Sequence, residues 1–152
     1  GGALINALGE LVGINTAIYS QSGGYQGVGF AVPSNLARRV MNDLIEYGHV
    51  RRGSIGYLEL ADLTTQLADQ LGVESDAGAL VSRMRRDTAA YDAGIRPGDV
   101  IVTVHGQAVE DASHALRLLS DAEIGSTATV VLAREGRAIE VEVEITLARP
   151  RR

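Results

Sequence analysis

The segment 93–101, Ala-Gly-Ile-Arg-Pro-Gly-Asp-Val-Ile, constrains the fold more than any other part of this chain. Gly94 is expected to end a short helix, and Pro97-Gly98 sets a tight turn shortly after it. Asp99 can accept hydrogen bonds from the backbone amides of that turn. The apolar residues 100–102 are typical of a buried strand. A helix end, a turn and a buried strand in so short a segment indicate a mixed domain of strands and helices.

Periodic patterns around this segment predict the rest of that domain. Residues 138–147 alternate Ile and Val with Glu, which predicts a strand with one buried and one solvent-facing side. The same reasoning predicts strands at 55–61, 78–84, 99–104 and 127–134, a strand or turn at 107–109, and helices at 63–71, 88–93 and 112–121. These elements favour an α+β domain, a compact and partly open β-barrel with two main helices.

The first third of the chain follows a separate pattern. Residues 3–6, 10–18 and 28–32 predict strands, and the polar, Gly-rich residues 19–27 predict a loop. Ser34 is expected to cap a helix that ends at Gly48. We therefore divide the chain into a first part, a linker, a second domain and a basic tail, at 1–48, 49–53, 54–148 and 149–152.

Composition excludes several classes of function. The net charge of −5 argues against nucleic acid as a partner, because phosphate binding needs a clustered positive field. The chain has no cysteine, and its three histidines are far apart, so we expect neither a metal site nor a cofactor. Five Tyr, one Phe and no Trp leave the core to be built from Ala, Val, Leu and Ile.

Two sets of motifs carry a family resemblance. In the first part they are GGALIN at 1–6, GELVGINTA at 9–17 and GVGFAVPS at 27–34. These resemble the end of the protease domain in the HtrA/Deg family, which are extracytoplasmic serine proteases with one or two PDZ domains after the protease. The second set, AGIRPGDVI at 93–101 and VHGQAV at 104–109, resembles the middle of a PDZ domain. The resemblance implies the last strands and closing helix of a trypsin-like β-barrel, followed by one PDZ domain.

The resemblance also implies a chemistry. In the parent protease it is acyl transfer through a Ser-His-Asp triad with an oxyanion hole. By this resemblance the chain begins just after the catalytic serine, so we expect the chain itself to hydrolyse no peptide and name no catalytic residue in it. Asn15, Thr16 and Ala17 match the strand that pairs with the substrate backbone, and loop 19–27 matches a mobile loop beside the specificity pocket.

Peptide recognition is the activity that this chain is expected to retain. PDZ domains hold the C-terminal carboxylate of a peptide in backbone amides of a short loop and pair the peptide as an extra strand. Ile55, Gly56 and Tyr57 match that loop, and residues 57–60, which include Leu58, Glu59 and Leu60, match the edge strand. Leu116 and Leu119 are one helical turn apart on the helix that closes the groove, and for each of them pocket lining and plain core remain open.

Two residues depart from the family pattern. The position of Tyr57 more often holds a branched aliphatic residue, so its ring would either narrow the pocket or swing out over the groove. His114 lies too far along its helix to open the groove, so we expect it to be solvated.

The function predicted from sequence is therefore the C-terminal part of an HtrA-type serine endopeptidase of protein quality control, in which this chain is a peptide-binding module. Expected partners are C-terminal peptides of unfolded or misassembled proteins. The parent is expected to be a homotrimer or higher oligomer outside the cytoplasm, and the chain to self-associate through residues 1–33. The alternative is a PDZ adaptor with no protease, against which the GGALIN string argues.

Overall fold

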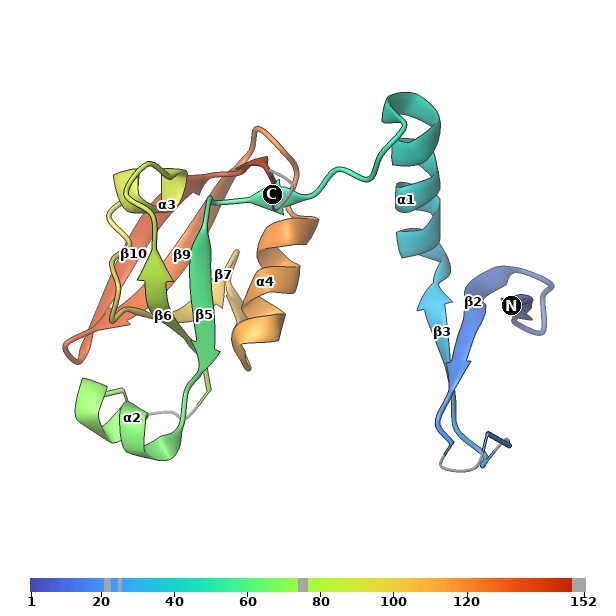
Figure 1. Cartoon of the computed structure of the whole chain (residues 1–152), viewed down its shortest axis with the longest axis horizontal. Coiled ribbons are helices and arrows are strands. Elements are labelled where there is room, and N and C mark those ends of the chain that lie inside the picture. The colour runs from blue at the N-terminus through green and yellow to red at the C-terminus, as the bar shows by residue number, and fades with distance from the viewer. Residues whose placement is uncertain (21–22, 25, 74–76, 149–152) are drawn as a thin grey trace. The chain divides into compact units, whose positions relative to one another are not determined.

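The computed structural model describes residues 1–20, 23–24, 26–73 and 77–148, and the chain divides into two units, Gly1–Arg51 and Arg52–Arg152 (Figure 1). The division falls inside the expected linker 49–53. The expected basic tail 149–152 and residues 21, 22 and 25 of the expected loop 19–27 lie outside the described residues.

The first unit is a three-stranded antiparallel sheet with one helix. Its strands are β1 (Ala3–Ile5), β2 (Leu11–Ile18) and β3 (Gly29–Pro33), in the order β1-β2-β3, and α1 (Ser34–Tyr47) packs against β2 and β3. The expectation that Ser34 caps α1 is wrong. Pro33 is the capping residue and no side chain accepts a hydrogen bond there, because β3 runs directly into the helix.

The second unit holds the remaining elements, and its path begins and ends with short strands that pair with each other. They are β4 (Gly53–Ser54), β5 (Leu58–Asp62), α2 (Thr65–Leu71), β6 (Ala79–Met84), α3 (Ala89–Asp92), β7 (Val100–Val104), β8 (Gln107–Ala108), α4 (Ala112–Asp121), β9 (Thr127–Arg134), β10 (Arg137–Glu144) and β11 (Thr146–Leu147). The main sheet has the order β10-β9-β7-β6-β5, with β8 beside β7 and β4 paired to β11. This open, sheet-dominated arrangement confirms the predicted α+β class, whereas the trypsin-like barrel remains a prediction.

Two expected strands differ from the observed ones, and a buried isoleucine lies at each difference, Ile55 in the first and Ile145 in the second. The expected strand 55–61 begins only at Leu58, because residues 55–57 form a loop between β4 and β5. The expected strand 138–147 breaks at Ile145, whose N–H donates to Ser126 O at 2.8 Å and whose carbonyl accepts from Gly125 N–H at 2.7 Å. Ile145 thus leaves the β9–β10 ladder and directs β11 toward β4.

The core of the second unit is aliphatic, as the scarcity of aromatic residues predicts. Its fully buried members come from β6, β7, β9, β10 and α4, among them Val81, Ile101, Ala115, Val130 and Val143. Burying side chains of this size contributes about 1.5–3 kcal/mol each for the Val and Ile members. The core therefore fixes α4 on one face of the sheet, beside β5.

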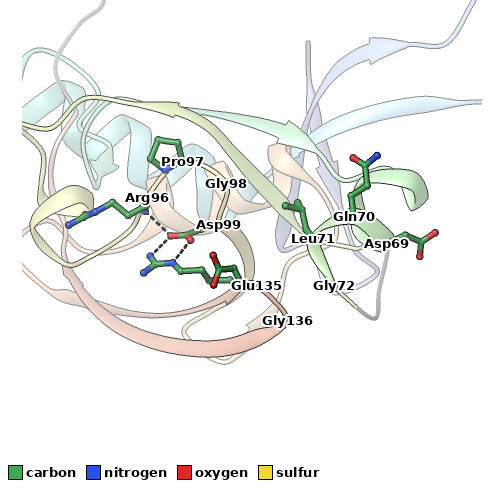
Figure 2. A pocket seen from close by; sticks show the side chains of 11 residues that line it. Asp69, Gln70, Leu71, Gly72, Arg96, Pro97, Gly98, Asp99, Glu135 and Gly136 are labelled. Carbon is green, nitrogen blue, oxygen red and sulfur yellow. Dashed lines mark hydrogen bonds and ion pairs between the residues drawn. The ribbon is translucent and has the colours of Figure 1, made fainter.

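Among the described residues of this unit, one charged side chain is buried. Asp99 is 1% exposed and accepts hydrogen bonds from Arg134 Nε at 2.6 Å, from Arg134 Nη2 at 2.7 Å and from the Arg96 backbone amide at 2.7 Å (Figure 2). Arg134 Nη2 also donates to Gly94 O at 2.7 Å. The hydrogen bond to Asp99 raises the pKa of the Arg134 guanidinium above its ordinary value. The expected role of Asp99 in its turn is confirmed for the Arg96 amide.

Removing this guanidinium should destabilise the second unit. In Arg134→Met, Asp99 would remain buried with one backbone donor, and we expect a loss of about 2–4 kcal/mol in the free energy of unfolding. The control is Arg85→Met, because Arg85 binds Asp87 with the same two-bond geometry on the surface. Urea unfolding followed by NMR amide signals of β7 and β9 measures both, and equal midpoints for the two variants would contradict this role of Asp99.

Candidate functional site

The loop 55–57 is held in place by α3. The Ile55 carbonyl accepts the Ala90 N–H at 2.9 Å, and the Ile55 side chain is 1% exposed in the core. Gly56 has a φ of +105°, and a Cβ at this position would lie 2.4 Å from the Thr88 Cβ. Thr88 in turn caps α3 by accepting the Tyr91 N–H at 3.3 Å. The loop therefore depends on glycine for both its conformation and its contact with the helix.

The amides of this loop are the groups expected to hold a carboxylate. Ser54 Oγ accepts the Gly56 N–H at 3.0 Å, so a hydroxyl oxygen already occupies one of them. Successive backbone amides in a turn can bind an anion, and the Gly56 N–H of this loop already points at an oxygen. Their assignment to a ligand carboxylate remains a prediction for Ile55, Gly56 and Tyr57.

Strand β5 is an edge strand whose free side faces α4. The sheet order places β5 last, next to β6, and α4 lies alongside it (Figure 1). The carbonyls of Tyr57 and Glu59 point toward β6, since they accept from the Arg85 N–H at 3.1 Å and from Ser82 Oγ at 3.0 Å. Backbone groups alternate along an antiparallel strand, so those of Leu58 and Leu60 point to the free edge.

A groove of about 310 Å³ lies between the loop, β5 and α4. Its lining comes from the chain on both sides of the loop and from the α4 face: Arg52, Gly53, Ser54, Ile55, Gly56, Leu58, Leu116, Arg117, Leu119, Ser120 and Ala148. We call this space the groove. It has an apolar floor and two arginines at the end nearest the loop.

The two helix leucines have different roles. Leu119 is 3% exposed and belongs to the core, although it also borders the groove, whereas Leu116 is 49% exposed and lines it. An exposed leucine on the wall of a groove is an unfavourable surface group that an apolar ligand would cover. The geometry thus supports the pocket role for Leu116 more than for Leu119.

Tyr57 stands outside the groove. Its ring is exposed, and its hydroxyl donates to Glu59 Oε1 at 2.6 Å, while Glu59 lies 3.7 Å from Arg83 Nη1. Leu58 takes its place in the lining. In the structure the Tyr57 ring does not narrow the pocket, which was one of the two alternatives drawn from the sequence.

The expectation that His114 is solvated is wrong. Its side chain is 20% exposed, and its Nδ1 accepts the Glu110 backbone N–H at 3.3 Å, so the ring is held against the turn that precedes α4. Asp111 caps the same helix by accepting the His114 N–H at 2.6 Å. His114 therefore supports the start of α4 and does not line the groove.

The candidate substrate strand of the first unit lies on β2. Asn15 pairs with Ala31 of β3, and its N–H donates to Gly2 O at 3.0 Å. Thr16 Oγ1 donates to the Ile14 carbonyl at 2.9 Å, and Ala17 pairs with Phe30. All three residues are exposed. Pairing of this strand with a substrate remains a prediction.

A second, larger hollow of about 650 Å³ lies over Asp99, between the end of α2, the turn before β7 and the turn between β9 and β10 (Figure 2). The carboxylate at its centre, that of Asp99, already accepts hydrogen bonds from Arg134 and from the Arg96 N–H. We therefore assign this carboxylate a structural role. Within the described residues no group of His, Cys, Asp and Glu is arranged to hold a metal ion. No helix of that part of the chain is long and apolar enough to cross a bilayer.

Sequence reasoning missed the supports of the loop and the two arginines at the end of the groove nearest the loop. Thr88 and Ala90 hold the loop, and a Thr that precedes a short apolar helix is a capping signal that could have been read. Arg52 and Arg117 were not singled out from the sequence, because their proximity follows only from the pairing of β4 with β11 beside α4.

Several known proteins are similar to this chain in both sequence and architecture. The family model described as PDZ domain matches residues 58–145. The periplasmic serine endoprotease DegP of Salmonella typhimurium is 39% identical over 145 residues, which are 95% of this chain and 30% of that protein. The HtrA-type protease AlgW, solved with a decapeptide and with a tripeptide, is 42% identical with a TM-score of 0.74 in both structures, and the match covers 99% of this chain and 46% and 50% of those chains.

The chain therefore spans less than a third of the length of the DegP relative and at most half of the AlgW chains.

The loop geometry yields a stability prediction. Gly56→Ala should cost about 2–4 kcal/mol, because the new Cβ adds overpacking against Thr88 to the strain of a positive φ. Gly106→Ala is the matched control, since Gly106 also has a positive φ of +74° but no atom within 4 Å of the Cβ position. We expect about 1 kcal/mol there, from strain alone. Thermal unfolding of both variants measures the difference, and equal losses would show that Thr88 does not constrain the loop.

Proposed function

Because this chain belongs to the PDZ domain family and is similar to HtrA-type serine proteases over nearly its whole length, we propose that it is the peptide-recognition part of such a protease. The predicted resemblance to that family is confirmed by this similarity. Within the chain, the proposed ligand is the free C-terminus of a protein, which adds as a strand to β5 with its terminal carboxylate at the loop 55–57.

The observation that carries the proposal is the combination found at one end of the groove. A free strand edge, an amide-rich loop and an apolar recess meet there, and Arg52 and Arg117 border the same space. The strand edge offers backbone hydrogen bonds, the amides and arginines favour a negative charge, and the recess takes an apolar side chain. The last residue of a peptide offers all three matching groups at once, since it has backbone hydrogen-bonding groups, a free carboxylate and a side chain that can be apolar.

The terminal side chain would lie over Leu58 and against Leu116. Since the whole groove measures about 310 Å³ and also contains peptide backbone, small final residues such as Ala or Val fit it better than Phe or Trp. A short peptide that buries one or two side chains binds with micromolar or weaker affinity, about −8 kcal/mol or less in magnitude.

The parent protein is proposed to be an extracytoplasmic serine endoprotease. DegP relatives are named as periplasmic endoproteases, and the AlgW structures carry bound peptides. In such a parent this module would bring exposed C-termini of misfolded proteins to the protease, within a homotrimer or larger oligomer. A PDZ adaptor without protease is the alternative. The similarity to proteases extends through residues that precede the PDZ domain, which favours the first reading.

Free and amidated peptides test the proposal directly. Free C-terminal peptides that end in Val should shift amide signals of the loop, β5 and α4. Their amides should bind about 10–100-fold more weakly, because the charge-assisted hydrogen bonds are lost. Leu116→Ser should weaken binding, whereas Leu44→Ser, which changes an equally exposed leucine on α1 of the first unit, should not. Equal affinity for free and amidated termini would place the ligand elsewhere.

The first unit yields a second test, of the expected self-association through residues 1–33. Gly13 is its single buried residue among those the structure describes, while Leu4, Ile14 and Phe30 are 40–57% exposed. So much exposed apolar surface favours association. Sedimentation velocity should show a mean mass that rises with concentration and rises less in Phe30→Ser than in the control Leu147→Ser. A constant monomer mass over the whole range would refute the expectation.

A further inference from the structure

The groove does not end where its apolar lining ends. Beyond Leu58 the strand β5 continues through Leu60 to Asp62, and these three residues share one face because side chains alternate along a strand. Leu58 and Leu60 both pack against the core. The irregularity between β5 and β6 does not disturb this alternation, since the extra residue, Ser82, lies on β6. From the loop outward, the face of β5 toward α4 therefore carries two apolar residues, Leu58 and Leu60, and then the acidic Asp62.

Asp62 reaches from β5 to the start of α4. Its Oδ1 accepts the backbone N–H of Ala112, the first residue of the helix, at 3.0 Å. This hydrogen bond spans the far end of the space between β5 and α4. Asp62 is exposed, and its second carboxylate oxygen has no partner among the residues that the structure describes. One oxygen therefore ties the strand to the helix while the other faces solvent.

We propose that Asp62 is a specificity-determining residue, which selects peptides carrying Lys or Arg at the fourth residue before their C-terminal residue. This inference rests on the proposed function and adds the ligand class to it. An apolar last residue would lie at Leu58, a small or apolar residue two positions earlier at Leu60, and a basic residue two positions before that at Asp62.

The register follows from the geometry of strand addition. If the terminal carboxylate binds the loop 55–57, the last residue pairs with Leu58, the first residue whose backbone points to the free edge. An antiparallel ligand then advances one residue for each residue of β5, so its fifth residue from the end lies opposite Asp62. Directly opposite residues point to the same face, with Cβ atoms about 4.5–5.5 Å apart. A Lys or Arg side chain spans that gap easily.

The charges around the groove have the matching polarity. Arg52 and Arg117 border the end that would receive the carboxylate. Three acidic residues, Asp62 on β5 and Glu110 and Asp111 in the turn before α4, lie at the other end. Asp111 uses its Oδ1 to cap α4, and Glu110 lies 3.9 Å from His114 Nδ1. The strand β5 also carries Glu59, but by alternation Glu59 lies on the opposite face, where it contacts Tyr57 and Arg83. Asp62 is therefore the carboxylate of β5 on the face that the ligand would share.

The test uses octapeptides that differ at one position. Their common terminus is Lys-Ser-Ala-Ser-Val with a free carboxylate, and Ala or Glu replaces Lys in the comparison peptides. In the unaltered chain we expect the Lys peptide to bind about two- to five-fold more tightly than the Ala peptide, since exposed ion pairs contribute modestly, and the Glu peptide to bind most weakly. The preference should shrink at high salt concentration.

Two variants separate charge from structure. Asp62→Asn keeps an oxygen that can accept the Ala112 N–H but removes the charge, so it should bind the three peptides equally while retaining its melting temperature. Glu140→Gln on β10, at the opposite edge of the sheet, is the matched control with the same change of net charge and should retain the full preference. Fluorescence anisotropy with labelled peptides and the whole chain gives all the affinities.

The outcomes also distinguish this inference from the proposed function. Amidated peptides that bind as well as free ones would overturn the proposed function. Free-terminus peptides that bind well but equally, whether they carry Lys, Ala or Glu, would overturn the role of Asp62 and leave the groove intact. A Lys preference that persists in Asp62→Asn would likewise overturn it, because another carboxylate would then be responsible.

Discussion

The ion pair between the buried Asp99 and the partly exposed Arg134 is the interaction on which the geometry of the second unit depends. It joins the end of β9 to the turn before β7, and through Gly94 O it also reaches the segment that follows α3. With this turn fixed, α3 presents the Ala90 amide and the Thr88 side chain to the loop 55–57. A salt bridge well away from the groove thus positions the backbone amides that are proposed to hold a carboxylate. Its bidentate geometry suits that task because it fixes orientation as well as distance.

Much of the fold could be predicted from the sequence because the patterns are local. The helix 112–121 and the strand 127–134 were predicted at their observed limits, since each has a regular apolar period and a clear turn beyond it. The failures have non-local causes. Ile145 looks like one more residue of an alternating strand, and only its hydrogen bonds to Gly125 and Ser126 take it out of the ladder. The Ser34 side chain does not cap α1, because the preceding strand continues to Pro33.

The candidate site shows the same division between local and non-local information. The loop could be located from Gly56 and its apolar neighbours, because only glycine suits that backbone. The same local reasoning could not decide which side chain of the strand lines the groove. Whether Tyr57 or Leu58 faces α4 depends on where the loop ends and β5 begins, and a shift of one residue exchanges the two faces of a strand. The arginines and Asp62 were missed for a related reason, since their proximity to the groove arises from pairing between segments far apart in sequence.

The two edges of the main sheet explain why strand addition would be confined to one of them. An open edge presents unpaired backbone groups to any extended chain, and proteins commonly protect such edges with charge. On β10 the residues Glu140, Glu142 and Glu144 are all exposed along one face of the edge strand, which disfavours an added strand through desolvation of three carboxylates. On β5 the residues facing α4 are Leu58 and Leu60, with a single carboxylate at the far end. An incoming peptide therefore gains apolar burial at β5 and meets charge at β10. The proposed ligand would therefore add where the helix α4 provides a second wall, with its terminal carboxylate at the loop 55–57 and its preceding residues running toward the start of that helix.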